Sequence, residues 1–82
     1  MLRYIHDRIT VDPDLCNGRP AIRGHRLTVQ TILEFLAAGD SPEDILEDYD
    51  FLELADIQAC QHFAMEMALE TITHRLYLPK AA

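Results

Sequence analysis

The feature that most constrains this chain is a change in the spacing of its apolar residues near residue 28. Before that point apolar side chains recur at every second position, as in Ile9 and Val11, which is typical of strands. From Thr28 onward the spacing becomes that of one helical face, with Val29, Ile32, Leu33 and Leu36. The chain therefore has a short β segment followed by helices.

The β segment is predicted to hold two short strands, near residues 8–11 and 20–23, that form a hairpin. Turn-forming residues stand between them, namely Asp12-Pro13-Asp14 and Asn17-Gly18. Asn-Gly supplies the positive φ angles that a tight hairpin turn requires. Pro20 cannot donate a ladder hydrogen bond, so the second strand is expected at an edge of the sheet.

Three helices are predicted after the hairpin. Thr28 suits the N-cap of the first helix, and Gly39 suits the residue just beyond its end. Ser41-Pro42 caps and opens a short second helix that ends near Tyr49-Asp50. The third helix begins near Leu54 and runs about twenty residues, ending before Pro79, which cannot continue it.

The expected fold is therefore α+β and mostly α: an N-terminal β-hairpin, residues 1–28, and a three-helix segment, residues 29–78. Eighty-two residues make a single domain, 1–82. The order of the helices resembles a helix-turn-helix unit. A third helix this long exceeds what so small a core can cover, so its outer half is expected to pack against a second subunit in a homodimer.

The charge is divided unevenly along the chain. Residues 1–28 carry five arginines against three aspartates, a net charge of +2, and residues 29–82 carry the remaining −9 of the total of −7. This division predicts two faces with different partners. No leader and no apolar run of membrane-spanning length stands out. Cys16 and Cys60 form no metal spacing, so free thiols in the cytoplasm are expected.

The candidate partner-binding residues are the arginines at the end of the β segment, Arg19, Arg23 and Arg26, together with Gly24 and His25. A guanidinium offers a planar fork of donors to a carboxylate or a phosphate. Gly24 lets a partner's backbone approach closely. The alternative for each arginine is an ion pair within the chain, with Asp12, Asp14 or the acidic helices.

No catalytic, cofactor or metal site is predicted. The chain lacks nucleophile-elbow, P-loop and dinucleotide-binding patterns. Its four histidines, His6, His25, His62 and His74, show no zinc-protease spacing. The acidic residues of the helical segment lack an EF-hand pattern and are interpreted as a solvated face.

DNA binding is the alternative function, because the helical order suits it. The charge argues against it, since residues 28–74 contain no lysine or arginine and phosphate contacts supply most non-specific affinity. Phosphate contacts would have to come from the N-terminal segment, including Arg3 and Arg8.

The residues also resemble a known family. The segment Ile9-Thr10-Val11-Asp12-Pro13 and the segment from Asn17 to Val29 are similar to the signature of the domain of unknown function 433, roughly I-x-x-D-P followed by G-[KR]-P-x-I-x-G-T-R-[IL]-x-V. The similarity continues through Ser41–Ile45 to Asp56-Ile57. Three positions depart from the pattern: His25 stands for Thr, Asp50-Phe51 replaces a Pro, and Glu53 replaces a Thr-like cap, which leaves the start of the third helix in doubt.

The resemblance implies a homeodomain-like three-helix fold and a VapB-like antitoxin that partners a PIN-like ribonuclease toxin. Such nucleases gather carboxylates around a divalent metal, and an arginine fork can pair with those carboxylates. The hypothesis is an antitoxin that neutralises the nuclease by direct binding. A DNA-binding regulator of its own operon is the alternative, and a structural dimer module is a third.

Overall fold

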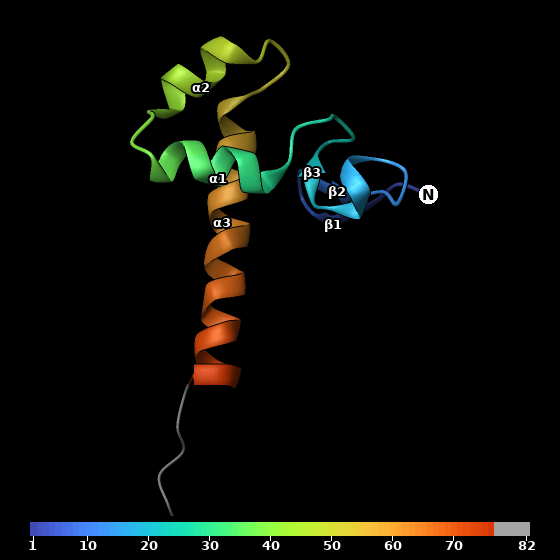
Figure 1. The fold of residues 1–82 in the computed structure, drawn as a ribbon, viewed down its shortest axis with the longest axis vertical. Coiled ribbons are helices and arrows are strands. Elements are labelled where there is room, and N and C mark those ends of the chain that lie inside the picture. Colours follow the sequence, from blue (N-terminus) through green and yellow to red (C-terminus); the bar gives the residue numbers. More distant parts are fainter. Residues whose placement is uncertain (77–82) are drawn as a thin grey trace, which may run out of the picture.

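The computed structural model describes residues 1–76, which form a small sheet followed by three helices. The order is β1 (Arg3–His6), β2 (Ile9–Val11), the 3-10 turn η1 (Cys16–Gly18), β3 (Ala21–Ile22), α1 (Val29–Ala37), α2 (Pro42–Asp48) and α3 (Leu54–Thr71), which continues into the π-helical turn η2 (Ile72–Leu76). The sheet and the helices lie side by side in Figure 1. The fold is α+β and mostly helical, as expected.

The sheet has three antiparallel strands in the order β1-β2-β3. The predicted pairing of residues 8–11 with 20–23 is confirmed, since Ile9 pairs with Ile22 and Thr10 with Ala21. The strand that holds Ala21 lies at an edge, as Pro20 requires. The first strand, Arg3–His6, was not predicted, because its side chains are mostly exposed and show no apolar alternation.

The connection between β2 and β3 also differs from the prediction. Asn17 and Gly18 do have positive φ angles, 56° and 77°, but they lie in η1, within a connection of nine residues, and not in a tight hairpin turn. The tight turn joins β1 to β2 at Asp7-Arg8, where no glycine marks it in the sequence.

The predicted starts of the three helices and the predicted ends of the first two are confirmed. The Thr28 hydroxyl accepts a hydrogen bond from the Thr31 N–H at 3.1 Å and caps α1. Beyond its end, Gly39, at a φ of 103°, donates to the carbonyl of Leu36, as a left-handed residue does after a helix. Ser41 and Asp44 form a reciprocal capping box at the start of α2.

The hydrophobic core lies between the sheet and the first halves of the helices. Its fully buried large side chains come from every layer: Ile9, Ile22, Ile32, Ile45 and Ile57. Helix α3 contributes only its first turns to this core, through Ile57, Ala59 and Cys60. Cys16 and Cys60 are both free thiols.

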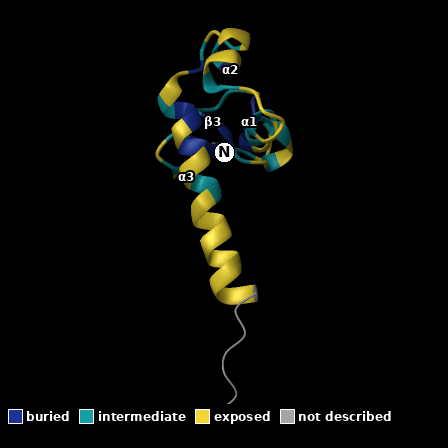
Figure 2. Ribbon diagram, turned by 90° about the vertical axis from the view of Figure 1, so that its left-hand side faces the viewer, coloured by how far each residue is buried: buried dark blue, intermediate teal, exposed yellow. Residues whose placement is uncertain are grey.

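The outer half of α3 extends beyond the core into solvent (Figures 1 and 2), and the described chain measures 55 × 33 × 19 Å. Three positions that were predicted on the inner stripe of this helix, Met67, Ala68 and Ile72, are exposed, because the helix continues past the core that its first turns cover. Pro79, the predicted stop, lies outside the described residues. Within residues 1–76 no helix combines the length and the apolar character needed to cross a bilayer.

Candidate partner-binding surface

The arginine segment is anchored to α3 by a two-pronged ion pair between Arg23 and Asp56. Arg23 Nε donates to Asp56 Oδ1 and Arg23 Nη2 donates to Asp56 Oδ2, both at 2.9 Å. Arg23 Nη2 also donates to the Phe51 carbonyl at 2.8 Å. Asp56 is completely buried in the first turn of α3, and a buried carboxylate requires such partners.

Arg8 and Glu53 complete this network. Arg8 Nη1 donates to Asp56 Oδ1 at 3.0 Å and to Glu53 Oε1 at 2.6 Å, and the Glu53 N–H donates to Asp56 Oδ2 at 2.9 Å. Burial alone would raise the pKa of Asp56, but hydrogen bonds from Arg23, the Glu53 backbone and Arg8 outweigh it and hold that pKa below its ordinary value. The carboxylate is therefore charged, and α3 begins directly after Glu53.

This network gives Arg23 and Arg8 roles within the chain. The sequence left two alternatives for Arg23, a partner's carboxylate or an internal one, and the structure shows an internal one. Arg8, a candidate for phosphate contact, likewise ties the β1–β2 turn to α3. Asp56 is the functional partner that sequence reasoning missed, because it lies 33 residues from Arg23.

Gly24 and His25 also contact neighbouring residues of the chain. Arg23 and Gly24 both have positive φ angles, 43° and 75°, and the Gly24 N–H donates to the buried Thr10 hydroxyl at 2.9 Å. The His25 ring stacks on Phe51, with ring centroids 3.9 Å apart and the planes within 10°. The turn is therefore held in one conformation by contacts on both sides.

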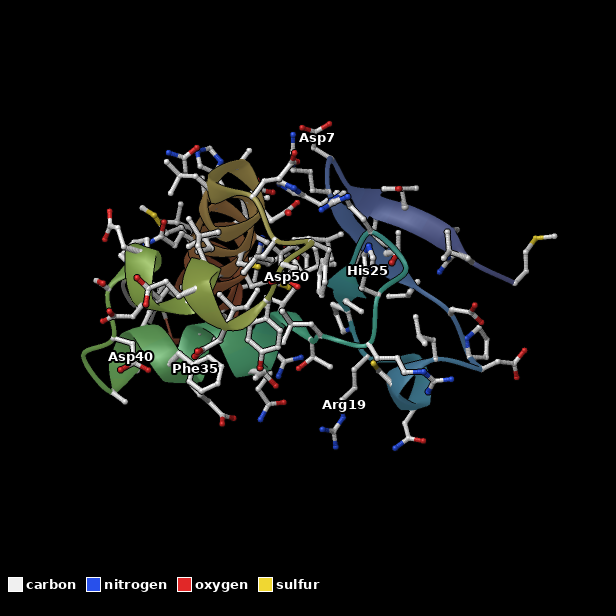
Figure 3. The ribbon with its side chains drawn as sticks, turned by 90° about the horizontal axis from the view of Figure 1, so that it is seen from above. Asp7, Arg19, His25, Phe35, Asp40 and Asp50 are labelled. Carbon is white, nitrogen blue, oxygen red and sulfur yellow. The ribbon has the colours of Figure 1, made fainter. Side chains whose placement is uncertain are left out.

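Arg19 and Arg26 differ from Arg23, because both are exposed and neither forms an ion pair within residues 1–75. Arg19 extends away from the ribbon into solvent in Figure 3. Arg3 is exposed too, on β1. The segment that the Arg23–Asp56 pair anchors therefore exposes two guanidinium groups, those of Arg19 and Arg26, that have no ion-pair partner within residues 1–75.

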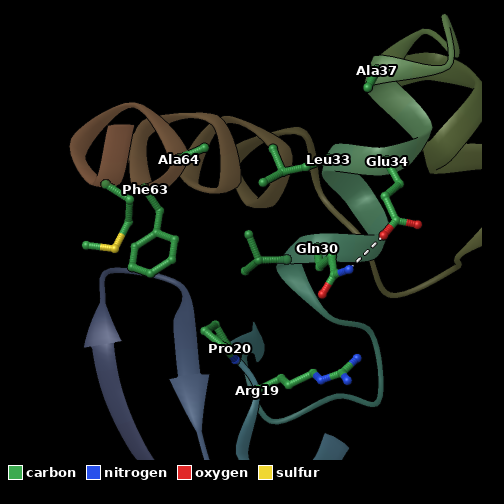
Figure 4. Close-up of a pocket in the computed structure, with 10 residues that line it drawn as sticks. Arg19, Pro20, Gln30, Leu33, Glu34, Ala37, Phe63 and Ala64 are labelled. Atoms are coloured by element: carbon green, nitrogen blue, oxygen red, sulfur yellow. Dashed lines mark hydrogen bonds between the residues drawn. The ribbon is translucent and has the colours of Figure 1, made fainter. Parts of the chain in front are cut away.

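Arg19 stands at the rim of an apolar groove of about 780 Å³ between α1 and α3 (Figure 4). Gln30 and Glu34, which hydrogen-bond each other at 2.9 Å, form the polar part of the wall. The rest of the lining is Pro20, Val29, Leu33, Ala37, Phe63, Ala64 and Met67. The groove offers an apolar floor with one positive and one negative group at its edge.

A second apolar stripe lies on the other side of α3. Met65, Leu69 and Ile72 are 64%, 62% and 53% exposed, and their spacing of four and three residues places them on one face. Met67, which lines the groove, is separated from Met65 by about 200° around the helix axis. The outer half of α3 is thus apolar on two faces, which is typical of helices that are buried.

The family model described as protein of unknown function (DUF433) matches residues 9–64. The chain belongs to the DUF433 family. Its fold is similar to the crystal structure of a DUF433 member protein from Anabaena variabilis ATCC 29413, with a TM-score of 0.70 and 27% identity, over 85% of this chain and 68% of that one. No curated protein matches the chain. The matched segment contains the arginine turn, Asp56 and every residue that lines the groove except Met67.

Proposed function

We propose that this DUF433 protein is an antitoxin-like binding module that neutralises a PIN-like ribonuclease toxin by direct binding, in the cytoplasm. The observation that carries the proposal is the outer half of α3, which leaves the body of the protein with large apolar side chains exposed. A patch of this kind on a small protein marks an interaction site. The described residues hold their buried charges in structural pairs, which suits a binding role better than catalysis.

The groove between α1 and α3 is the proposed docking site for an amphipathic segment of the toxin. Proteins commonly bind such segments by laying the apolar face of a helix into an apolar groove. Arg19 at the rim would pair with an acidic residue of the segment, and Glu34 with a basic one. These two charges would fix the direction in which the segment lies.

Arg19 and Arg26 are the proposed neutralising residues. The family pattern specifies a basic residue at position 19 and an arginine at position 26, and leaves position 23 open. The structure gives Arg23 an internal role and leaves Arg19 and Arg26 exposed. A residue that the pattern specifies and that the fold does not use is a good candidate for contact with a partner. Their forks would pair with the carboxylates that hold the nuclease's metal.

The stripe of Met65, Leu69 and Ile72 is the proposed contact of a homodimer. It faces away from the groove, so two copies could pair through it and leave both grooves open to toxin. Burying these side chains against a second copy would supply the apolar area that so small a core lacks.

DNA binding, the second candidate, would use the exposed Arg3, Arg19 and Arg26, which precede the three helices. Three exposed arginines favour it. The acidic helical segment weighs against it, because anionic side chains repel phosphate. A regulator of this kind must bind duplex DNA with an affinity that falls steeply as salt rises, and a pure toxin-binder need not bind it at all.

The decisive experiment uses the full chain and a purified PIN-like ribonuclease, taken from a neighbouring reading frame where one encodes such an enzyme. Wild type should form a stoichiometric complex and abolish cleavage of RNA. Arg19→Ala/Arg26→Ala should lose inhibition by at least tenfold, and Met67→Glu should weaken the complex by placing a charge in the groove. Arg3→Ala removes an exposed arginine of β1 to which the proposal gives no role; it is the matched control and should inhibit like wild type.

Two results would count against the proposal. Undiminished inhibition by the double arginine variant would remove the guanidinium mechanism. A wild-type chain that binds no such nuclease, yet binds duplex DNA with a steep salt dependence, would favour the regulator.

A further inference from the structure

A cluster of metal-ligating side chains that belong neither to the groove lining nor to the arginine turn lies where β1 meets α3. His6 ends β1, and His62 and Glu66 stand one turn apart on α3. Their ligand atoms all lie within 4.8 Å of one another. Nothing in the sequence indicates this cluster, because His6 is more than fifty residues from the other two ligands and only the packing of β1 on α3 brings them together.

The distances are close to those of a metal site. In a tetrahedral site with bonds of about 2.0–2.1 Å, neighbouring ligand atoms are about 3.3 Å apart. His6 Nε2 and Glu66 Oε1 are already 3.3 Å apart, and His62 Nδ1 lies 3.9 Å from the same oxygen. His62 is 79% exposed, so its ring can rotate to bring its ligand nitrogen closer to the other two ligand atoms, which lie within 4.8 Å of it.

His6 is the preorganised member of the cluster. Its side chain is only 19% exposed, and its ring packs edge-on against Phe63, with centroids 5.9 Å apart and planes at 76°. Its Nδ1 is buried without a hydrogen-bond partner among the described residues. Its Nε2 is the ring nitrogen that contacts Glu66, with Oε1 at 3.3 Å. This packing fixes the direction in which one ligand points before a metal arrives.

A small recess of about 270 Å³ adjoins the two imidazoles. His6, His62, Asp7 and Gln58 contribute to its wall. It leaves space beside His6 and His62 for water or for a fourth ligand, and the Asp7 carboxylate and the Gln58 amide are nearby oxygen donors. A three-ligand site with such an open position is typical of zinc when the metal is not fully enclosed.

We propose that His6, His62 and Glu66 bind one divalent transition-metal ion, with zinc the first candidate, and that this ion links β1 to α3. Two imidazoles and one carboxylate suit zinc, copper, nickel or iron, whereas calcium and magnesium prefer oxygen ligands alone. The three proposed ligands do not line the groove and do not include Arg19, so the proposal does not depend on the antitoxin role.

The test is a zinc titration of the tag-free full chain after removal of metal with a chelator. We expect one zinc per chain with a Kd of about 10 μM or tighter, a limit that is at least about two orders of magnitude weaker than the Kd of four-ligand structural sites. His62→Ala and Glu66→Gln change exposed side chains, so they should fold normally. Each should weaken binding at least tenfold, whereas His74→Ala, an exposed histidine outside the cluster, should not.

Replacing zinc by cobalt then identifies the ligands. The visible spectrum should show nitrogen and oxygen ligation without the charge-transfer band that a cysteine thiolate gives. A Kd weaker than about 1 mM, binding that His62→Ala and Glu66→Gln leave intact, or a thiolate band would each overturn the proposal.

Discussion

Replacing Asp56 by Asn should destabilise the fold more than any other single loss of charge in the described chain. The carboxylate accepts four hydrogen bonds, two from Arg23 and one each from Arg8 and the Glu53 N–H. Asn has nearly the same shape, but it carries no charge and turns an amide N–H toward the guanidinium groups. The substitution therefore removes the attraction while leaving the packing almost unchanged.

The magnitude follows from the burial of the pair. Breaking a buried ion pair by removing one partner costs about 3–5 kcal/mol. Asp56 is fully buried, but the side chains of Arg23 and Arg8 are 29% and 30% exposed and keep part of their hydration. We therefore expect Asp56→Asn to lower the free energy of unfolding by about 3 kcal/mol, the lower end of that range. For a domain of this size that loss lowers the melting temperature by roughly 12–24 °C.

Thermal and urea unfolding, followed by circular dichroism at pH 7, measure this loss. Asp50→Asn is the matched control, because it removes one negative charge from an exposed position and should change stability by less than about 0.5 kcal/mol. If Asp56→Asn melts within a few degrees of wild type, the pair does not anchor the arginine turn and the reasoning fails.

The pH dependence provides a second check on the same residue. Because the pKa of Asp56 is lower in the folded chain than its ordinary value of 3.8, the charged carboxylate stabilises the fold above that value and this stabilisation is lost as the pH falls below it. The difference in unfolding free energy between wild type and Asp56→Asn should be constant above about pH 5 and shrink below about pH 4. A difference that grows on acidification would contradict the assignment.

Three further predictions concern the cap, the thiols and the dimer. Thr28→Ala removes the α1 cap and should cost about 1 kcal/mol in urea unfolding, whereas Thr28→Ser should retain most of it. Burial raises the pKa of Cys60 to about 12, so a thiol reagent should modify only the partly exposed Cys16 in the native chain; rapid modification of two thiols would contradict the burial. Light scattering should give twice the chain mass for wild type and one chain mass for Met65→Glu/Leu69→Glu, and a monomeric wild type would remove the proposed dimer contact.

The features that the sequence predicted well are those set by neighbouring residues. Thr28, Gly39 and Ser41 act on backbone groups within four positions, so their roles can be inferred locally. The strand pairing of β2 with β3 followed from the apolar alternation of Ile9 and Val11 and from the turn-forming residues after them. Strand β1 was not predicted because it covers little of the core, and its mostly exposed side chains show no alternation of apolar and polar residues.

The site was harder to predict, because its key contacts join distant parts of the chain. Asp56 is one of many carboxylates in the helical segment, and only its burial separates it from the solvated ones. The apolar residues directly after it, Ile57 and Cys60, were a usable signal, since they place the first turn of α3 inside the core. The sequence could not say which arginine would reach that turn.

The anchoring of Arg23 bears on what Arg19 and Arg26 can do. A flexible loop would lose conformational entropy when its guanidinium groups bind a partner. Here Arg23, Gly24 and His25 are held by Asp56, Thr10 and Phe51, so the backbone between the two exposed arginines is already ordered. Asp56→Asn should therefore weaken nuclease inhibition even at temperatures where the variant remains folded, although Asp56 itself is buried and cannot touch the partner.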